Sequence, residues 1–251
     1  MKTLVLMSGL AMRANEYLPF AASLAPRRVL HFDNPCVGEG PRTSGPLSIL
    51  DQARHQWSEI ERAVGKQPVH LFGLSMGGMI ASTMASIEPA RTLSLVVAAT
   101  SPNIMPTAEA VPAELETAWL GARTKDDLAL AIDIAFGKTT KLENRKVRDA
   151  YFMYRATAQN LQTNSEFAQQ LGAIRSFDGA SVYRKCNETK IPSLVIAGEE
   201  DELFPAAHSE LIGSLLGTEV QTIKKTGHML HVEAVDLLSE KVQRFLSRVE
   251  S

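Results

Sequence analysis

The sequence predicts an α/β protein, built on a doubly wound and mostly parallel sheet with a helical segment inserted into it. Three observations predict this class. Short apolar runs alternate with longer segments of helical period through the first hundred residues, a pattern typical of βαβ units with right-handed crossovers. Strand-like runs disappear over residues 103–187 and return at 191–198. The chain has 251 residues, 45% of them hydrophobic, which is enough for one large core.

The elements predicted for the first half alternate along the chain. Strands are expected where β-type apolar residues cluster, and helices where apolar residues recur every three or four positions. Glu88-Pro89 is expected to end the helix that follows Ser75, because a residue before proline avoids the helical region. In chain order, we expect strands at 3–7 and 28–32, a helix at 49–64, a strand at 69–72, the helix after Ser75 and a strand at 93–99.

Helical patterns dominate the middle of the chain, in stretches such as KDDLALAIDIAFG and SEFAQQLGAIRSF. IPSLVIAG restores a strand at 191–198, EVQTIKKTG indicates another at 219–225, and VDLLSEKVQRFLSRV indicates a closing helix. We therefore expect one core formed by residues 1–102 and 188–251, with a helical cap, or lid, formed by residues 103–187.

Charge and cysteine content exclude several classes of protein. The formal net charge of -2 provides no basic surface for DNA or RNA, so we expect no nucleic-acid partner. Cys36 and Cys186 lie far apart in sequence and form no C-x-x-C pair, which argues against a zinc site or a disulfide framework. We expect a cytoplasmic protein with no bound metal.

The N-terminal stretch MKTLVLMSGLAM has two interpretations. A lysine followed by a short apolar run resembles a signal peptide, but Arg13, Asn15 and Glu16 follow at once and no small-residue cleavage site does. The same residues are better interpreted as the first strand of the sheet. Because no run approaches the roughly 20 apolar residues of a membrane span, we expect a soluble chain with no membrane partner.

The most informative motif is Gly73-Leu74-Ser75-Met76-Gly77, which fits G-x-S-x-G between a predicted strand and a predicted helix. A serine on such a sharp turn has a strained backbone, and the residues two before and two after it come close together. Glycine fits there because it has no side chain. The following helix begins with free N–H groups that can stabilise developing negative charge. Ser75 is therefore the candidate nucleophile.

Serine is a weak nucleophile unless a base activates it, and the base needs an orienting group. A doubly wound sheet gathers such groups in the loops at the carboxyl ends of its strands. Asp201 follows the strand at 191–198, and His228 follows the strand at 219–225. The chain order Ser75, Asp201, His228 is the order expected after a strand–turn–helix nucleophile. Alternative acids beside Asp201 are Glu199, Glu200 and Glu202.

These motifs resemble those of the α/β-hydrolase superfamily, in its capped serine esterase branch, and they occur in order along nearly the whole chain. In that family G-x-x-D-x-x-x-P marks the acid, and here Gly198 and Pro205 flank Asp201 at that spacing. A Gly-His pair marks the base, which is His228 in this sequence. The resemblance implies the catalytic triad Ser75, Asp201 and His228 and no cofactor.

An oxyanion hole is also implied by the resemblance. Its two donors are the backbone N–H groups of Met76, directly after the nucleophile, and of Leu10, in the loop after the first strand. Two departures concern neighbouring loops. Ser8 stands where the family usually has histidine, and Cys36 stands at a glycine position of the motif Asp33 to Gly38. Both concern the shape of a loop rather than the reaction.

The predicted cap carries the candidate substrate contacts. Aromatic and methionine side chains at helical spacing more often pack in a core, but some can line a cleft that binds an apolar acyl group. We take Trp119, Phe136 and Met153 as candidate substrate-binding residues.

The cap also carries a run of basic residues, interpreted either as a solvated helix face or as a docking surface for an acidic acyl carrier protein. The short chain and Thr100-Ser101-Pro102 after a strand loosely resemble the pimeloyl-acyl-carrier-protein methyl ester esterases. The basic residues are Lys138, Lys141, Arg145, Lys146 and Arg148.

The function predicted is that of a serine carboxylic-ester hydrolase acting on a small or medium apolar acyl ester. A second hypothesis keeps the triad but changes the bond, as in a C–C hydrolase, an enol-lactonase or a cofactor-free lyase or perhydrolase. Arg123, Arg155 and Arg175 are the candidates that would bind the carboxylate of such a substrate. A third hypothesis is a binding protein that uses the hydrolase fold without turnover.

Overall fold

The computed structural model describes residues 1–103, 125–157 and 162–251. Within them a parallel sheet of six strands has the order β2-β1-β3-β4-β5-β6. The first strand, β1, lies inside the sheet. The chain adds β2 on one side of it and then β3, β4, β5 and β6 in succession on the other side. The strands are β1 (Leu4–Met7), β2 (Val29–His31), β3 (Val69–Leu74), β4 (Thr92–Ala98), β5 (Ser193–Gly198) and β6 (Val220–Ile223).

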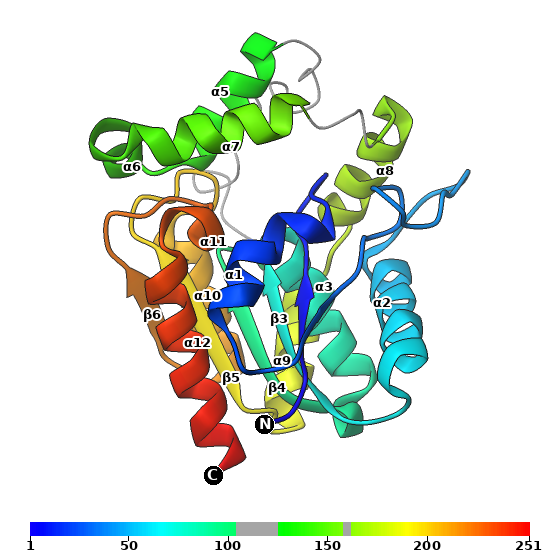
Figure 1. Ribbon diagram of the computed structural model, residues 1–251. Helices are drawn as coiled ribbons and strands as arrows, with labels where there is room; N and C mark the ends of the chain where they lie inside the picture. The colour runs from blue at the N-terminus through cyan, green and yellow to red at the C-terminus, as the bar shows by residue number, and fades with distance from the viewer. Residues whose placement is uncertain (104–124, 158–161) are drawn as a thin grey trace.

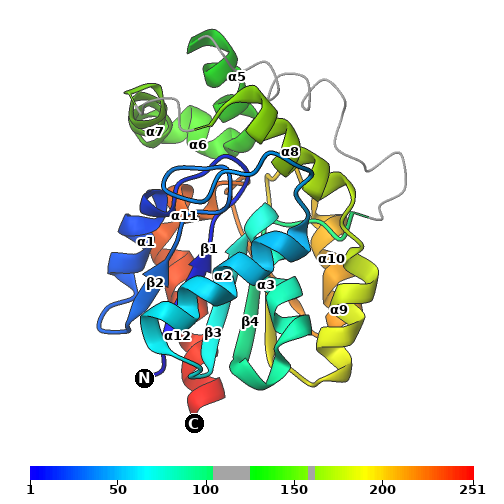
Figure 2. The same cartoon turned by 90° about the vertical axis from the view of Figure 1, so that its right-hand side faces the viewer.

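Helices cover both faces of this sheet (Figures 1 and 2). Those of the first half are η1 (Ala14–Tyr17), α1 (Leu18–Ser23), α2 (Ile49–Val64), α3 (Met76–Ile87) and η2 (Pro89–Arg91). Those between β4 and β5 are α5 (Lys125–Ala135), α6 (Lys138–Glu143), α7 (Arg145–Thr157), α8 (Asn164–Arg175) and α9 (Gly179–Glu188). The remaining helices are α10 (Ala206–Leu216), α11 (Leu230–Glu233) and α12 (Val235–Glu250).

Alternation along the strands divides the core into two layers. Successive side chains of a strand point to opposite faces of the sheet. Val5 and Met7 accordingly pack with Trp57 of α2 and Met79 of α3. Leu4 and Leu6 pack on the other face, among residues of α1 and α12 such as Phe20 and Val242. The central strands β1 and β3 are buried along their whole length, as expected for a parallel sheet covered on both faces.

The predicted doubly wound sheet is confirmed, with one of its strands longer than expected. The helix predicted at 49–64 has those bounds, and Ser48 caps it by accepting a hydrogen bond from the Asp51 N–H at 3.1 Å. Strand β3 continues two residues beyond the predicted 69–72, because Gly73 and Leu74 still pair with β4. None of the helices in the described ranges is long and apolar enough to cross a membrane.

The helices between β4 and β5 fall into two groups. Figure 1 shows α5, α6 and α7 beyond one end of the sheet, on the side away from both termini. Helix α9 instead contacts α3 and α10 and contributes Tyr183 to the core on that face. We call α5–α8 the inserted helices. The division into a core and a cap at 103–187 stays a prediction, and residues 104–124 lie outside the described part of the chain.

Candidate functional site

Ser75 lies at the junction between β3 and α3, in the strained backbone that its motif predicts. Its φ of 58° and ψ of -129° are unusual for a residue with a side chain. Three hydrogen bonds hold this peptide in place. The Ser75 N–H donates to Ala98 O at 3.0 Å, and Ser75 O accepts from the Gly78 N–H at 2.8 Å and from the Thr100 hydroxyl at 2.7 Å. The strand next to β3 therefore fixes the turn that carries Ser75.

The two glycines of the motif allow this turn to pack against its surroundings. A Cβ on Gly73 would overlap the carbonyl group of Gly77, and a Cβ on Gly77 would overlap the carbonyl group of Met7 at the end of β1. Neither obstacle is a side chain that could turn away. Close approach of backbone segments is therefore the reason for glycine at both positions.

Asp201 and His228 meet above the carboxyl ends of β5 and β6. His228 Nδ1 lies 2.9 Å from Asp201 Oδ2, and both side chains are almost fully buried. The other oxygen of Asp201 accepts the N–H groups of Leu203 and Phe204, each at 2.9 Å. Because an ionised carboxylate only accepts hydrogen bonds, His228 carries its proton on Nδ1 and leaves Nε2 free to accept one.

Two of the neighbouring glutamates have other partners. Glu200 accepts the backbone N–H of Thr139 at 2.6 Å and its hydroxyl at 2.5 Å, which joins this loop to α6. Glu199 accepts the N–H of Lys225 at 2.9 Å. The structure therefore pairs His228 with Asp201, the residue that the glycine and proline spacing favours.

The loop after β1 passes directly beside Ser75. A Cβ on Gly9 would be 3.4 Å from the Ser75 Cβ, so Leu10 follows at the edge of the nucleophile. Met76, the other predicted oxyanion donor, is the first residue of α3. Asn34 donates to Ser8 O at 2.9 Å and anchors the loop from below. The Ser8 hydroxyl is buried and has no hydrogen-bond partner in the described part of the chain, so it anchors none of these residues where the family usually has histidine.

Glu233 holds the loop that carries His228. Its carboxylate accepts backbone N–H groups from Gly227 at 3.2 Å, Met229 at 3.1 Å and Gly137 at 2.8 Å. Burial raises the pKa of Glu233, while these hydrogen bonds act in the opposite direction. The His228 N–H donates to Ala135 O at 2.8 Å. The end of α5 and Glu233 together fix the backbone on both sides of the imidazole.

His231 is a second buried imidazole close to His228. Its ring stacks on Tyr17 with a centroid separation of 4.4 Å, and neither ring nitrogen has a hydrogen-bond partner among the described residues. Burial, with a smaller effect from His228, lowers the pKa of His231 to about 3. It is neutral at ordinary pH and packs as an aromatic ring.

The two described candidates for substrate binding, Phe136 and Met153, differ in their exposure to solvent. Phe136 is 1% exposed and packs beside Tyr151 with a centroid separation of 5.7 Å. Met153 is 58% exposed on α7, so its side chain faces solvent rather than a covered pocket wall. Trp119 lies outside the described residues. A role of these three residues in substrate binding stays a prediction.

The residues of the basic run differ in their exposure and in their partners. Arg148 pairs with Asp133 at 2.7 Å and with Asp149 at 3.1 Å, and the Lys141 ammonium donates to Asp133 O at 2.7 Å. These two side chains help to join α5, α6 and α7. The exposed members of the run are Lys138, Arg145 and Lys146, of which Arg145 lies 3.5 Å from Asp149.

Arg155 has an intramolecular partner in place of the substrate carboxylate considered for it. Its guanidinium lies 2.6 Å from Glu16 and also donates to Ala11 O at 3.0 Å. Arg123 lies outside the described residues, and Arg175 is exposed at the end of α8.

Sequence reasoning missed three residues that hold the loops of the site: Glu233, Arg155 in this anchoring role, and Gln170. Gln170 is completely buried on α8 and accepts the Ala11 N–H at 3.1 Å. Each of the three contacts segments distant in sequence, so no local motif could have identified them.

Comparisons with known proteins identify the family of the chain. The family model described as "alpha/beta hydrolase fold" matches residues 2–235. A Bacillus subtilis protein named as a candidate 2-succinyl-6-hydroxy-2,4-cyclohexadiene-1-carboxylate synthase is 27% identical, over 85% of this chain and 80% of its own. A Xanthomonas oryzae pimeloyl-[acyl-carrier protein] methyl ester esterase is also 27% identical, over 98% of this chain and 95% of its own.

A solved structure shows the same fold. A thermophilic esterase from Thermogutta terrifontis superposes with a TM-score of 0.83 at 17% identity, covering 100% of this chain and 91% of its own. The fold and the esterase-named relatives together support a hydrolase. Since the family model spans most of the sequence, the chain belongs to the alpha/beta hydrolase fold family.

Proposed function

We propose that the chain is a serine hydrolase of carboxylic esters with a catalytic triad formed by Ser75, His228 and Asp201. The hydrogen bond between His228 Nδ1 and Asp201 is the observation that carries the proposal. It orients an imidazole at the sheet edge where Ser75 is held in a strained turn. A nucleophile, a base and an orienting acid are the three parts that acyl transfer through serine requires.

The reaction follows from these positions. His228 Nε2 takes the proton of the Ser75 hydroxyl as Oγ attacks the ester carbonyl, and Asp201 stabilises the imidazolium that results. The N–H groups of Leu10 and Met76 bind the oxyanion. Each such donor is typically worth about 3 kcal/mol of transition-state stabilisation. His228 then gives its proton to the departing alcohol, which leaves an acyl group bonded to Ser75 Oγ. Water attacks this acyl carbon as His228 takes a proton from it, and His228 returns the proton to Ser75 Oγ when the acid departs.

Hydrolysis of p-nitrophenyl esters of increasing acyl length tests this function. We expect turnover by the native chain and a loss of about 10⁴-fold or more in kcat for Ser75→Ala. Asp201→Asn is expected to lose a comparable factor, because the amide nitrogen would donate to His228 Nδ1 and favour the wrong tautomer of the imidazole. A fluorophosphonate probe should label the native chain on Ser75 alone. Absence of turnover together with absence of labelling would refute the proposal.

An acyl-carrier-protein methyl ester is the more specific substrate that one relative suggests. The relative's name gives that substrate, and here Lys138, Arg145 and Lys146 are exposed on α6 and α7. Lys225, in the loop after β6, is exposed and lies beside α6, where its ammonium is 3.7 Å from Glu143. An acidic carrier protein is the natural complement of these basic side chains.

Reversal of one surface charge tests the proposed docking of an acyl carrier protein. Lys146→Glu should raise KM for an acyl-carrier-protein ester and leave KM for a p-nitrophenyl ester unchanged. The effect should shrink as salt is added, because exposed charges are screened. Equal effects on both substrates would exclude the docking surface while leaving the ester hydrolase intact.

Cleavage or formation of a C–C bond remains the alternative chemistry, and the name of the Bacillus subtilis relative favours it. The pairing of Arg155 with Glu16 weighs against it, since this guanidinium already neutralises a carboxylate of the chain itself. Turnover of a vinylogous 1,5-diketone acid faster than of any ester would favour this alternative over the ester hydrolase.

A further inference from the structure

The inserted helices hold the peptide that follows the proposed oxyanion donor Leu10. The N–H of Ala11 donates to Gln170 Oε1 at 3.1 Å, and the carbonyl of Ala11 accepts from Arg155 Nη1 at 3.0 Å. One contact comes from α8 and the other from α7. Both polar groups of Ala11 are therefore bound by the inserted helices, immediately beside the residue that would donate to the oxyanion.

Ala11 needs this support because its backbone is left-handed. It is the third residue of a turn closed by the Met12 N–H on Gly9 O at 3.3 Å, and its φ is 55°. A positive φ at this position of a turn is usually taken by glycine. An alanine there adopts the conformation only when contacts outside the turn hold it.

Gln170 is itself fixed in one orientation. Its side chain is completely buried, its Nε2 donates to Pro35 O at 2.9 Å, and its Oε1 also accepts from Gln162 at 2.9 Å. The amide thus joins the loop after β1 to the loop after β2. Rotation of the amide would exchange donor for acceptor at both loops and break both hydrogen bonds.

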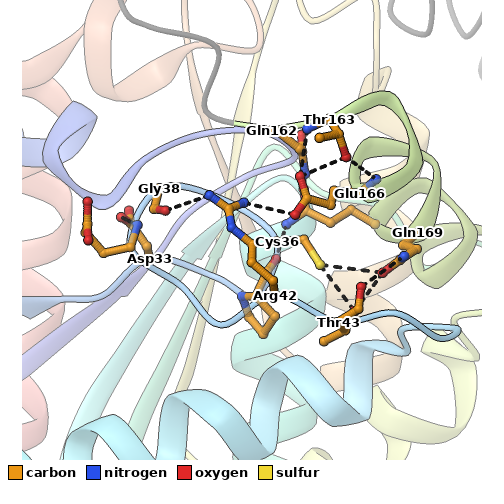
Figure 3. Close-up of polar contacts among 12 residues, drawn as sticks. Asp33, Cys36, Gly38, Arg42, Thr43, Gln162, Thr163, Glu166 and Gln169 are labelled. Atoms are coloured by element: carbon orange, nitrogen blue, oxygen red, sulfur yellow. Dashed lines mark hydrogen bonds and ion pairs between the residues drawn. The ribbon is translucent and has the colours of Figure 1, made fainter.

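Helix α8 is attached to the loop after β2 by further contacts. Figure 3 shows Arg42 reaching from this loop to Glu166, at 3.2 Å, and to the carbonyl of Gly38 at 2.9 Å. It also shows Thr43 beside Gln169, whose Oε1 accepts the Thr43 hydroxyl at 2.7 Å. The ion pair of Arg42 with Glu166 attaches α8 independently of both Ala11 and Gln169, so Gln170 stays in place when either of those contacts is removed.

Arg155 is fixed by a buried ion pair. Its partner Glu16 has a side chain that is 1% exposed and also accepts the Tyr151 hydroxyl at 2.6 Å. Glu16 in turn accepts the Arg13 N–H at 2.9 Å, within the same loop as Ala11. Arg155 therefore connects α7 to both ends of this loop.

We propose that Gln170 and Arg155 are positioning residues that fix the Ala11 peptide and so direct the Leu10 N–H toward the oxyanion. The inference rests on the proposed ester hydrolysis and adds that the inserted helices contribute to the rate of the chemical step. Neither side chain touches the reacting atoms.

Gln170→Met tests the proposal with a side chain of similar length that cannot accept the Ala11 N–H. We expect kcat for a p-nitrophenyl ester to fall about 10- to 100-fold with KM within twofold, since a displaced oxyanion donor affects the transition state selectively. Affinity for a trifluoromethyl ketone, which forms a hemiketal oxyanion with Ser75, should fall by the same factor. Gln169→Ala, on the same helix but bonded to Thr43, is the control and should retain kcat within twofold.

A second substitution distinguishes a loss of loop positioning from a general destabilisation of α8. Ala11→Gly, introduced into Gln170→Met, should recover most of the lost kcat, because glycine adopts φ of 55° without side-chain strain. A merely destabilised α8 would not be repaired by a change in this turn. For Arg155, Arg155→Lys should keep more kcat than Arg155→Met. Tyr154→Phe, which removes only a bond to Asn15, should leave kcat within twofold.

The outcomes distinguish this inference from the proposed function. If the native chain hydrolyses no ester, the proposed function fails. Amide hydrogen exchange in the peptide spanning residues 8–13 then decides whether Gln170 holds the loop. Exchange should be at least tenfold faster in Gln170→Met than in Gln169→Ala. The inference is overturned if native turnover is seen and Gln170→Met keeps kcat within twofold, or if Gln169→Ala matches its loss, or if the exchange rates are equal.

Discussion

The buried imidazole of His231 makes the stability of this chain sensitive to acid. Its pKa is about 3 in the folded protein against 6.5 in an unfolded chain. Because the folded pKa is depressed, the unfolded state binds a proton first as the pH falls below 6.5. The free energy of unfolding therefore decreases between pH 6.5 and pH 3.

His231→Phe should remove this sensitivity while keeping a ring stacked on Tyr17. For the native chain we expect the imidazole to account for a loss of about 3 kcal/mol of unfolding free energy between pH 7 and pH 4. Urea denaturation at the two pH values measures the difference. The loss should be smaller by that amount in the variant, and an equal loss in both proteins would contradict the assignment.

How far the site could be predicted differs from residue to residue. The proposal of Ser75, Asp201 and His228 came from motifs whose spacing is set by local turns. Gln170 and Arg155 have no such motif, because their partners are brought together only by the folded chain. His208, on α10, is 2% exposed, and its Nδ1 lies 2.9 Å from the Ser101 hydroxyl. A helix with apolar neighbours on most sides buries a histidine that its periodicity alone does not reveal.

At the scale of elements, the end of α5 and the loop after β6 cross at two glycines. A Cβ on Gly227 would overlap the backbone of Gly137, and a Cβ on Gly137 would be 2.6 Å from the Gly227 nitrogen. The Gly-His pair of the family motif accounts for the glycine before His228. Sequence reasoning could not identify Gly137 as its counterpart in the insertion, because the need for a glycine there arises where two distant segments meet.

Gly227→Ala should therefore lower both stability and activity. Backbone on both sides must move, at a cost of about 1–3 kcal/mol, and the shift displaces His228. Gly172→Ala is the matched control, since Gly172 lies inside α8 with open space at its Cβ position. Alanine there should raise stability by about 0.5–1 kcal/mol. Thermal unfolding and kcat of the two variants test the pair, and a neutral Gly227→Ala would contradict the crossing.

At the scale of the whole molecule, Glu250 near the end of α12 connects the amino ends of three strands. Its carboxylate accepts from Arg27 at 2.6 Å, from the Lys2 N–H at 2.8 Å and from His70 at 3.1 Å. These segments lie before β2, β1 and within β3. Sequence patterns predicted the closing helix but not this contact, which joins residues more than 170 positions apart.

The charge of Glu250 should appear in the pH dependence of stability. The Arg27 hydrogen bond, with smaller contributions from its other partners, lowers the pKa of Glu250 to about 2, from 4.5. Its stabilisation is therefore complete above pH 4.5 and is lost as the pH falls toward 2. Glu250→Gln should cost about 1 kcal/mol at pH 7, after allowance for solvent screening. The difference from the native chain should shrink below pH 4.

Glu240→Gln provides the control for this measurement. Glu240 lies on the same helix and pairs with Arg244 at 2.6 Å, but both side chains are well exposed. Its removal should change the unfolding free energy by less than about 0.5 kcal/mol. Equal effects of the two substitutions would show that Glu250 contributes no more than an ordinary surface pair.

The buried pair between Glu16 and Arg155 restricts the exchange of the inserted helices with those of a relative. In a scaffold whose lid is an independent part, a lid from a relative could be transplanted to alter substrate preference at constant turnover. Here such a graft would leave Glu16 as a buried carboxylate without its cation, in η1, directly after the loop that flanks Ser75. Recombination of this family around such a pair should succeed only when the first twenty residues and the inserted helices are inherited together.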